Sequence, residues 1–183
     1  MFATCTALTS IPGDLFPEGT VLEDSCCRAM FSDCQNLVDV PENILHPTVL
    51  AKNCYFAMFN KCKKLTILPK LPAPQLAQNC YRQMFQECTS LVTIREDLFP
   101  ENISMTSSNE CCREMFARCT SLTHVPDLSS GELIYNCYYG MFLGCTSLVV
   151  PPELPSTKLA GQCYYSMFSG CTSLQTAPEL PAD

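Results

Sequence analysis

Cysteine is the residue type that offers the most chemistry in this sequence, because fifteen of the 183 residues are cysteines. A thiol can form a disulfide, bind a metal, serve as a redox centre or fill space in a core, where free cysteine is often buried. The two histidines, His46 and His124, stand in no recognisable arrangement with a nucleophile. Phosphate-binding loops and paired-carboxylate motifs are also missing. The sequence therefore predicts no catalytic residue, no cofactor and no enzyme activity.

The spacing of the cysteines reveals an internal repeat. Met-Phe pairs begin at residues 1, 30, 58, 84, 115, 141 and 167. Each Phe is followed by a cysteine three residues later and a leucine six residues later, and each of the last six is preceded by a cysteine five residues earlier. The pattern Cys-Tyr-x-x-Met-Phe-x-x-Cys-x-x-Leu thus occurs six times, after part of a seventh copy. A fixed period of this length indicates a repeat architecture.

Within one unit the apolar positions predict a short helix. In the last copy, Cys163, Met167, Phe168, Cys171 and Leu174 fall at intervals of 0, 4, 5, 8 and 11, which lie on one face of an α-helix. Small polar residues precede the first cysteine in four copies and are expected to cap these helices. They are Ser25, Asn53, Asn79 and Asn136.

A short strand is expected after the leucine of each unit. In the segments 8–12, 65–69 and 122–126 an apolar residue follows the leucine by three positions, and a proline then ends the strand. Stacked units would place strands on one side and helices on the other. We therefore predict an α/β fold, a leucine-rich-repeat solenoid of about six to seven units that forms one domain over residues 1–183. Because neither end has a polar capping unit, we expect a piece of a longer array or self-association through open ends.

Helical geometry favours a packing role for the cysteines. Cysteines eight residues apart on a helix are separated by about 12 Å, whereas a disulfide needs Cα atoms within roughly 7 Å. No Cys-x-x-Cys motif suggests a metal site. Disulfides and a metal site remain the less favoured alternatives. Cys27 and Cys112 are exceptions, because each occupies the position that is tyrosine in the other copies. We expect these two thiols to be exposed.

A longer repeat period, the net charge and the distribution of apolar residues limit the classes of function that are expected. A segment Asp-Leu-Phe-Pro-Glu occurs at 14–18 and again at 97–101, each time before a Cys-Cys pair, which suggests a duplicated block of three units. The net charge is −7, which disfavours nucleic acid as a partner. The sequence has no apolar run long enough to span a membrane and no signal peptide, so membrane insertion is not expected.

The repeat resembles the BspA-like leucine-rich repeats. The segments Met141-Phe142-Leu-Gly-Cys145-Thr-Ser-Leu148 and Met167-Phe168-Ser-Gly-Cys171-Thr-Ser-Leu174 carry the likeness, although the inward residue five before Phe is cysteine here and usually aliphatic in that family. The resemblance implies a bacterial or protozoan surface protein at the cell surface or outside the cell. It also implies adhesion to a host or cell-surface protein or to a glycan.

A binding surface is expected on the predicted strands, because solenoids present strand side chains on a broad face. The position two after each leucine changes from copy to copy, and Arg95 stands where most copies have proline. The predicted ligand-facing residues are Ser10, Asp39, Ile67, Thr93, Arg95, His124, Val150 and Thr176. The alternative is that these residues are merely solvated and that the chain is a structural spacer with no ligand of its own.

Overall fold

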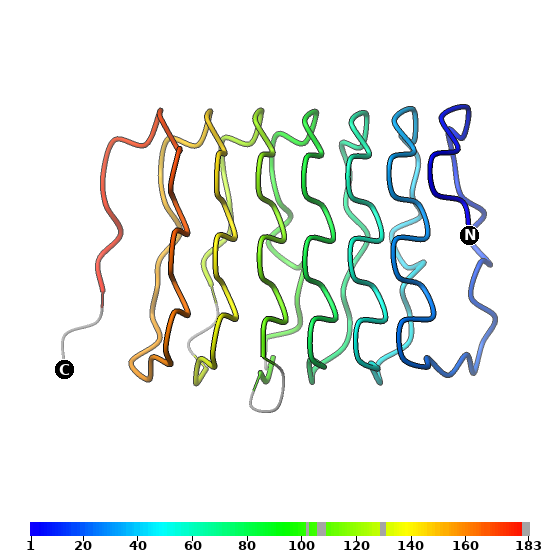
Figure 1. Cartoon of the computed structure of the whole chain (residues 1–183), viewed down its shortest axis with the longest axis horizontal. Helices are drawn as coiled ribbons and strands as arrows, with labels where there is room; N and C mark the ends of the chain where they lie inside the picture. The colour runs from blue at the N-terminus through cyan, green and yellow to red at the C-terminus, as the bar shows by residue number, and fades with distance from the viewer. Residues whose placement is uncertain (102, 106–108, 129–130, 181–183) are drawn as a thin grey trace.

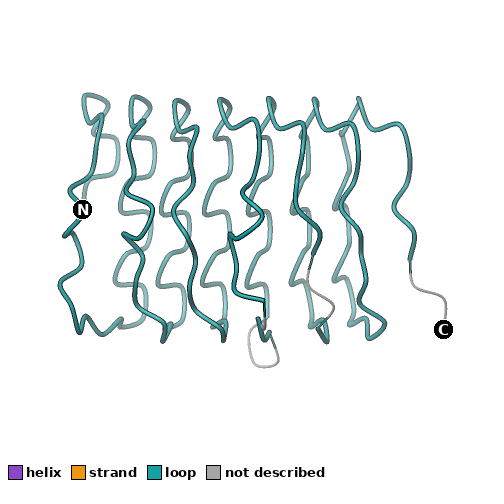
Figure 2. Cartoon of the chain, turned by 180° about the vertical axis from the view of Figure 1, so that it is seen from behind, coloured by secondary structure: helices purple, strands orange, loops and turns teal. Residues whose placement is uncertain are grey.

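The chain folds as an elongated stack of similar coils, with the first and the last described residues at opposite ends of the long axis (Figure 1). This computed structural model describes all residues except 102, 106–108, 129–130 and 181–183. Each coil consists of a ten-residue run of turns, a tight loop and a return segment. The runs form one layer and the return segments form the other, which faces the viewer in Figure 2. The six complete runs are 24–33, 52–61, 78–87, 109–118, 135–144 and 161–170.

The predicted unit of one strand and one helix is wrong. In the described part of the chain there is no helix, and the only β pairing consists of isolated parallel bridges. The bridges join Ser10 to Asp39, Val49 to Gln75, Gln75 to Ser104, and Thr93 to His124. The fold is therefore a solenoid of turns and loops and not an α/β solenoid.

Backbone hydrogen bonds alternate in direction along each run. In the run 52–61, the N–H groups of Cys54, Phe56 and Met58 each donate to the carbonyl three residues earlier. The N–H groups of the residues between them, Tyr55 and Ala57, donate to carbonyls of the next coil. Every run from 24–33 to 135–144 sends five such bonds to the coil that follows it. Since each residue bonds either within its coil or across to a neighbour, neither a helix nor a β ladder forms.

A left-handed residue recurs at every fourth position of the runs. In the third run the positive φ values belong to Asn79, Gln83 and Glu87, at 55°, 56° and 60°. A positive φ at the third residue of a turn is typical of type II turns, and these alternate here with turns whose two central residues have negative φ. The asparagines predicted as helix caps occupy this position, because Asn tolerates the left-handed region better than most residues.

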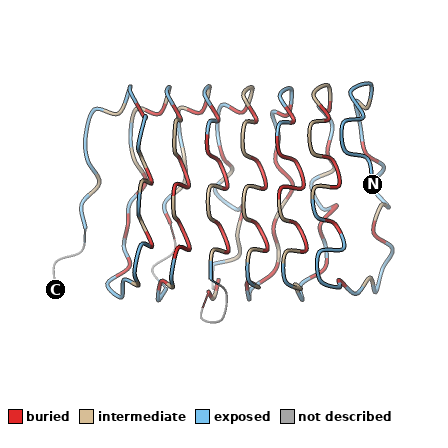
Figure 3. Cartoon of the chain, viewed as in Figure 1, coloured by how far each residue is buried: buried red, intermediate tan, exposed pale blue. Residues whose placement is uncertain are grey.

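The core lies between the two layers and is built as columns of equivalent side chains. Buried residues recur at the same height from coil to coil, and the first and last coils are the most exposed (Figure 3). The phenylalanines of successive Met-Phe pairs stack with centroids 5.5 to 6.0 Å apart. Packed helices need 8–10 Å between their axes, so coils this close leave no room for them. The stacking distance thus accounts for the missing helices.

Glycine at a left-handed position provides a test of this backbone. Gly144 has a φ of +72°, and a Cβ added there would lie 3.3 Å from Cγ of Arg118. We expect Gly144→Ala to lower the free energy of unfolding by about 1–2 kcal/mol, because alanine is strained in this region. Urea denaturation would measure the change.

The matched control is Gly13→Ala. A Cβ at Gly13 would meet no atom within 4 Å, and its φ is not positive. We expect a change within about 0.5 kcal/mol at this site. Equal effects of the two substitutions would contradict the proposed turn geometry.

Candidate functional site

The predicted ligand-facing row lies on the return layer, and its residues are exposed. The parallel bridges align Ser10 with Asp39 and Thr93 with His124, so the row is continuous across those coils. In the coils between the two ends, each position follows a leucine that is buried in the core, and the residue after it is buried or half-buried, which fixes its outward direction. The exposed residues two after each leucine are Ser10, Asp39, Ile67, Thr93, His124, Val150 and Thr176. Contact of this row with a ligand stays a prediction.

Arg95 differs from the other predicted residues because acidic neighbours engage it. Its guanidinium lies 2.5 Å from Asp97 and 2.6 Å from Glu42, and Lys70 bridges the same two carboxylates at 2.9 and 3.2 Å. Hydrogen bonds from Arg95 and then from Lys70 lower the pKa of Asp97 to about 2. Arg95 therefore holds three coils together at the edge of the row.

The cysteines form buried columns, as the packing prediction requires. All fifteen are free thiols, and only Cys5 and Cys26 are exposed. Desolvation is the main reason that the pKa of Cys54, Cys62, Cys119 and Cys137 rises to about 12. These thiols are protonated at neutral pH and are poor nucleophiles.

The prediction that Cys27 and Cys112 are exposed is wrong. Cys27 is 4% exposed and Cys112 is fully buried. Cys27 and Cys112 occupy the fourth position of their runs, which belongs to an inward pair that recurs every four residues, so this position points into the core whatever its side chain. Cys26 is exposed, and its sulfur lies 3.6 Å from that of Cys27.

The second cysteine of each unit forms a specific hydrogen bond that the sequence did not reveal. The Cys62 thiol donates to the carbonyl of Phe31 at 3.2 Å, and Cys88 donates to Phe59 at 3.3 Å. The same bond from Cys to the Phe of the preceding coil recurs in the other units. An aliphatic side chain could fill this space but could not donate, which explains why the position is always cysteine.

The Cys-Cys pairs and the Asp-Leu-Phe-Pro-Glu segments are structurally linked. Tyr55 stacks on Tyr81, and the equivalent fourth positions of the runs on either side of this pair are Cys27 and Cys112. Where cysteine replaces the tyrosine, a phenylalanine from the return layer packs against the tyrosine of a neighbouring coil. Phe16 meets Tyr55 at 6.3 Å and Phe99 meets Tyr81 at 6.1 Å. The co-occurrence of the two motifs in the sequence was a signal of this substitution.

Two kinds of site are not seen in the described residues. No group of three or more His, Cys, Asp or Glu side chains is arranged to hold a metal ion. Within the same part of the chain, no helix has the length and apolar character needed to cross a membrane.

Known proteins give little guidance. No family model matches the chain, and no curated protein matches it in sequence. One similar structure is a leucine-rich repeat protein from Bacteroides ovatus ATCC 8483, with 22% identity and a TM-score of 0.44 over 93% of this chain and 45% of that one. Another is a leucine-rich cell surface protein from Faecalibacterium prausnitzii A2-165, with 18% identity and a TM-score of 0.34 over 95% of this chain and 60% of that one.

The chain thus spans about half the length of the solved structures that it matches. Both neighbours are bacterial leucine-rich proteins. The function of this chain has to be inferred from its own surface.

Alkylation tests the assignment of exposed and buried thiols. We expect iodoacetamide to modify Cys5 and Cys26 in the native protein and the other thirteen cysteines only after denaturation, because burial excludes the reagent. Peptide mass spectrometry would locate the modified sites. The double variant Cys5→Ser/Cys26→Ser should show no native labelling, and native labelling of Cys112 would contradict the assignment.

Alkaline pH should destabilise the fold through the buried thiols. An unfolded thiol ionises near its ordinary pKa of 9.0, whereas Cys62 and Cys119 stay protonated up to about pH 12 in the folded state. A raised folded-state pKa gives stability that is fully present below pH 9 and is lost as the pH rises towards 12. Each such thiol should lower the free energy of unfolding by up to about 1.4 kcal/mol per pH unit in this window.

A serine variant isolates the contribution of one thiol. Cys119→Ser keeps a hydrogen-bond donor for Phe85 but does not ionise in this range. Urea denaturation at pH 8, 9, 10 and 11 should show a shallower loss of stability for this variant than for the native protein. Cys5→Ser, at an exposed site, serves as the control and should leave the slope unchanged. A native slope in Cys119→Ser would argue against the assigned pKa.

Proposed function

We propose that this chain is a recognition module that binds a macromolecular partner through the exposed row on its return layer. The observation that carries the proposal is the contrast between constant and varied positions. Inward residues are nearly the same in every coil, whereas the outward position two after the leucine is Ser, Asp, Ile, Thr, His, Val or Thr. A regular frame with varied outward side chains suits recognition better than it suits a spacer.

Exposed aliphatic side chains in and beside the row favour a protein partner over a glycan. Val38, Ile67, Val92 and Val150 are 45%, 65%, 50% and 56% exposed. They lie one or two residues after the leucines of four different coils, so they spread apolar surface along the row. Protein interfaces combine such apolar patches with a polar rim, which Asp39 and its neighbours would supply.

The resemblance to BspA-like repeats supports a location at the cell surface and an adhesive role. Under this proposal the partner is a host or cell-surface protein, and no nucleic acid is involved because the chain carries a net charge of −7. The ion-paired cluster around Arg95 would then keep the coils in register beneath the row.

A binding screen with matched variants tests the proposal. The purified chain would be measured by surface plasmon resonance against immobilised extracellular-matrix and cell-surface proteins, and on a glycan array. We expect Ile67→Ser combined with His124→Ala to weaken binding to any protein hit at least tenfold, because both side chains lie in the row. Asp39→Ala and Thr93→Ala should add smaller losses.

Val49→Ser is the control, since Val49 is 81% exposed but belongs to the separate bridge row with Gln75. It should leave the affinity unchanged. Equal losses from the control and the row variants would overturn the proposed surface. A screen without a protein hit would favour the spacer, and hits confined to the glycan array would exclude a protein partner.

A further inference from the structure

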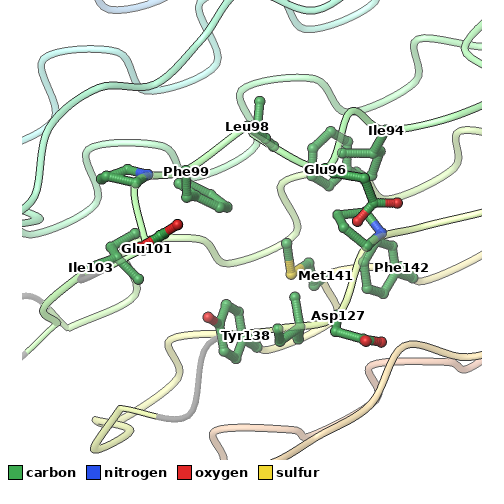
Figure 4. Close-up of a pocket in the computed structure, with 14 residues that line it drawn as sticks. Ile94, Glu96, Leu98, Phe99, Glu101, Ile103, Asp127, Tyr138, Met141 and Phe142 are labelled. Carbon is green, nitrogen blue, oxygen red and sulfur yellow. The ribbon is translucent and has the colours of Figure 1, made fainter.

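One partly open cavity in the described part of the chain is lined by charged side chains of a single sign. It lies between residues 94–101 and Ile103 of one return segment and residues 126–128 of the next, and has a volume of about 190 Å³. Its floor is formed by side chains of two neighbouring runs, among them Tyr138, Met141 and Phe142 (Figure 4). We propose that this cavity binds a small organic ammonium compound that carries a single aromatic ring.

The irregularity of the repeat explains why a cavity forms here. In the first Asp-Leu-Phe-Pro-Glu segment, Phe16 packs against Tyr55 of the following coil. In the second segment Phe99 packs against Tyr81 of the preceding coil instead, at 6.1 Å. The cavity lies on the other side of Phe99, where Tyr138 of the following coil also lines it. The cavity therefore forms because the Phe99 ring packs against the preceding coil and leaves the space towards the following coil unfilled.

The size and lining suit one aromatic ring. Apart from three carboxylates, the wall consists of prolines and apolar or aromatic side chains such as Ile94, Leu98 and Leu128. Dry apolar cavities of about 150 Å³ accept a molecule of the size of benzene. A ring bound here would contact Phe99 and Met141, and both aromatic and sulfur contacts are favourable.

The charge of the lining selects a cation. Glu96, Glu101 and Asp127 line the cavity and are exposed to solvent, and no Lys, Arg or His lines it. The carboxylate of Asp127 is held in place by the backbone N–H of Glu153 at 2.9 Å. The adjacent base Arg95 is engaged by Asp97 and Glu42. An ammonium group attached to the ring would thus lie in a cavity whose charged lining residues are all carboxylates, without a competing cation.

A series of three ring compounds tests the inference. The probes are 2-phenylethylamine, its neutral analogue 2-phenylethanol and the anion 3-phenylpropionate, titrated into the full chain by isothermal calorimetry and saturation-transfer NMR. We expect the amine to bind at least tenfold more tightly than the alcohol, and the anion to bind most weakly. Raising the salt concentration to 1 M should reduce this preference. Equal binding of amine and anion, or no binding of the amine at millimolar concentration, would overturn the proposal.

Variants locate the site. Glu96→Gln combined with Glu101→Gln should weaken amine binding about tenfold and leave the alcohol unchanged, because the substitutions remove charge but little volume. The control is Glu18→Gln, since Glu18 is the counterpart of Glu101 in the first Asp-Leu-Phe-Pro-Glu segment. Leu128→Phe should fill part of the cavity and weaken both compounds, with thermal denaturation reporting whether it folds. Full amine affinity in the double glutamine variant would place binding elsewhere.

Discussion

The close approach of successive coils is the constraint on which the rest of this structure depends. Every second backbone N–H of a run must reach a carbonyl of the next coil, because buried backbone groups without partners are costly. This requirement brings the phenylalanine rings to within 5.5–6.0 Å of one another. It also explains the left-handed residue at every fourth position, which turns the chain so that the alternate N–H groups face the same neighbour.

The same constraint explains the composition of the core. Equivalent residues of adjacent coils stack directly on each other, so each side chain in a column must pack well against an identical side chain. Planar rings do so by parallel stacking, and cysteine does so because it is small and its thiol can donate to the Phe carbonyl one coil away. Burial keeps these thiols protonated, and among the cysteines only Cys5 and Cys26 are exposed.

The cavity and the varied outward row both occur where the chain departs from strict repetition. When Cys27 or Cys112 replaces a tyrosine, a phenylalanine from the other layer compensates, and the second compensation leaves a cavity behind Phe99. The outward row varies freely because no column constrains it. Both proposed binding surfaces therefore arise at positions that the stacking requirement does not fix: the row lies outside the columns, and the cavity lies where one column is interrupted.

The sequence by itself determined the repeat, most of the inward residues and the packing role of most cysteines, since these follow from spacing and residue type. It also identified an outward row that is exposed. It could not determine the local conformation, because residues at intervals of 0, 4, 5 and 8 share a face on an α-helix and on a ribbon of four-residue turns alike. Gly140 and Gly144 inside one run were the available warning against a helix. Only the tertiary structure decided the outcome, because hydrogen bonds to the next coil replace helical ones and thereby bury Cys27 and Cys112.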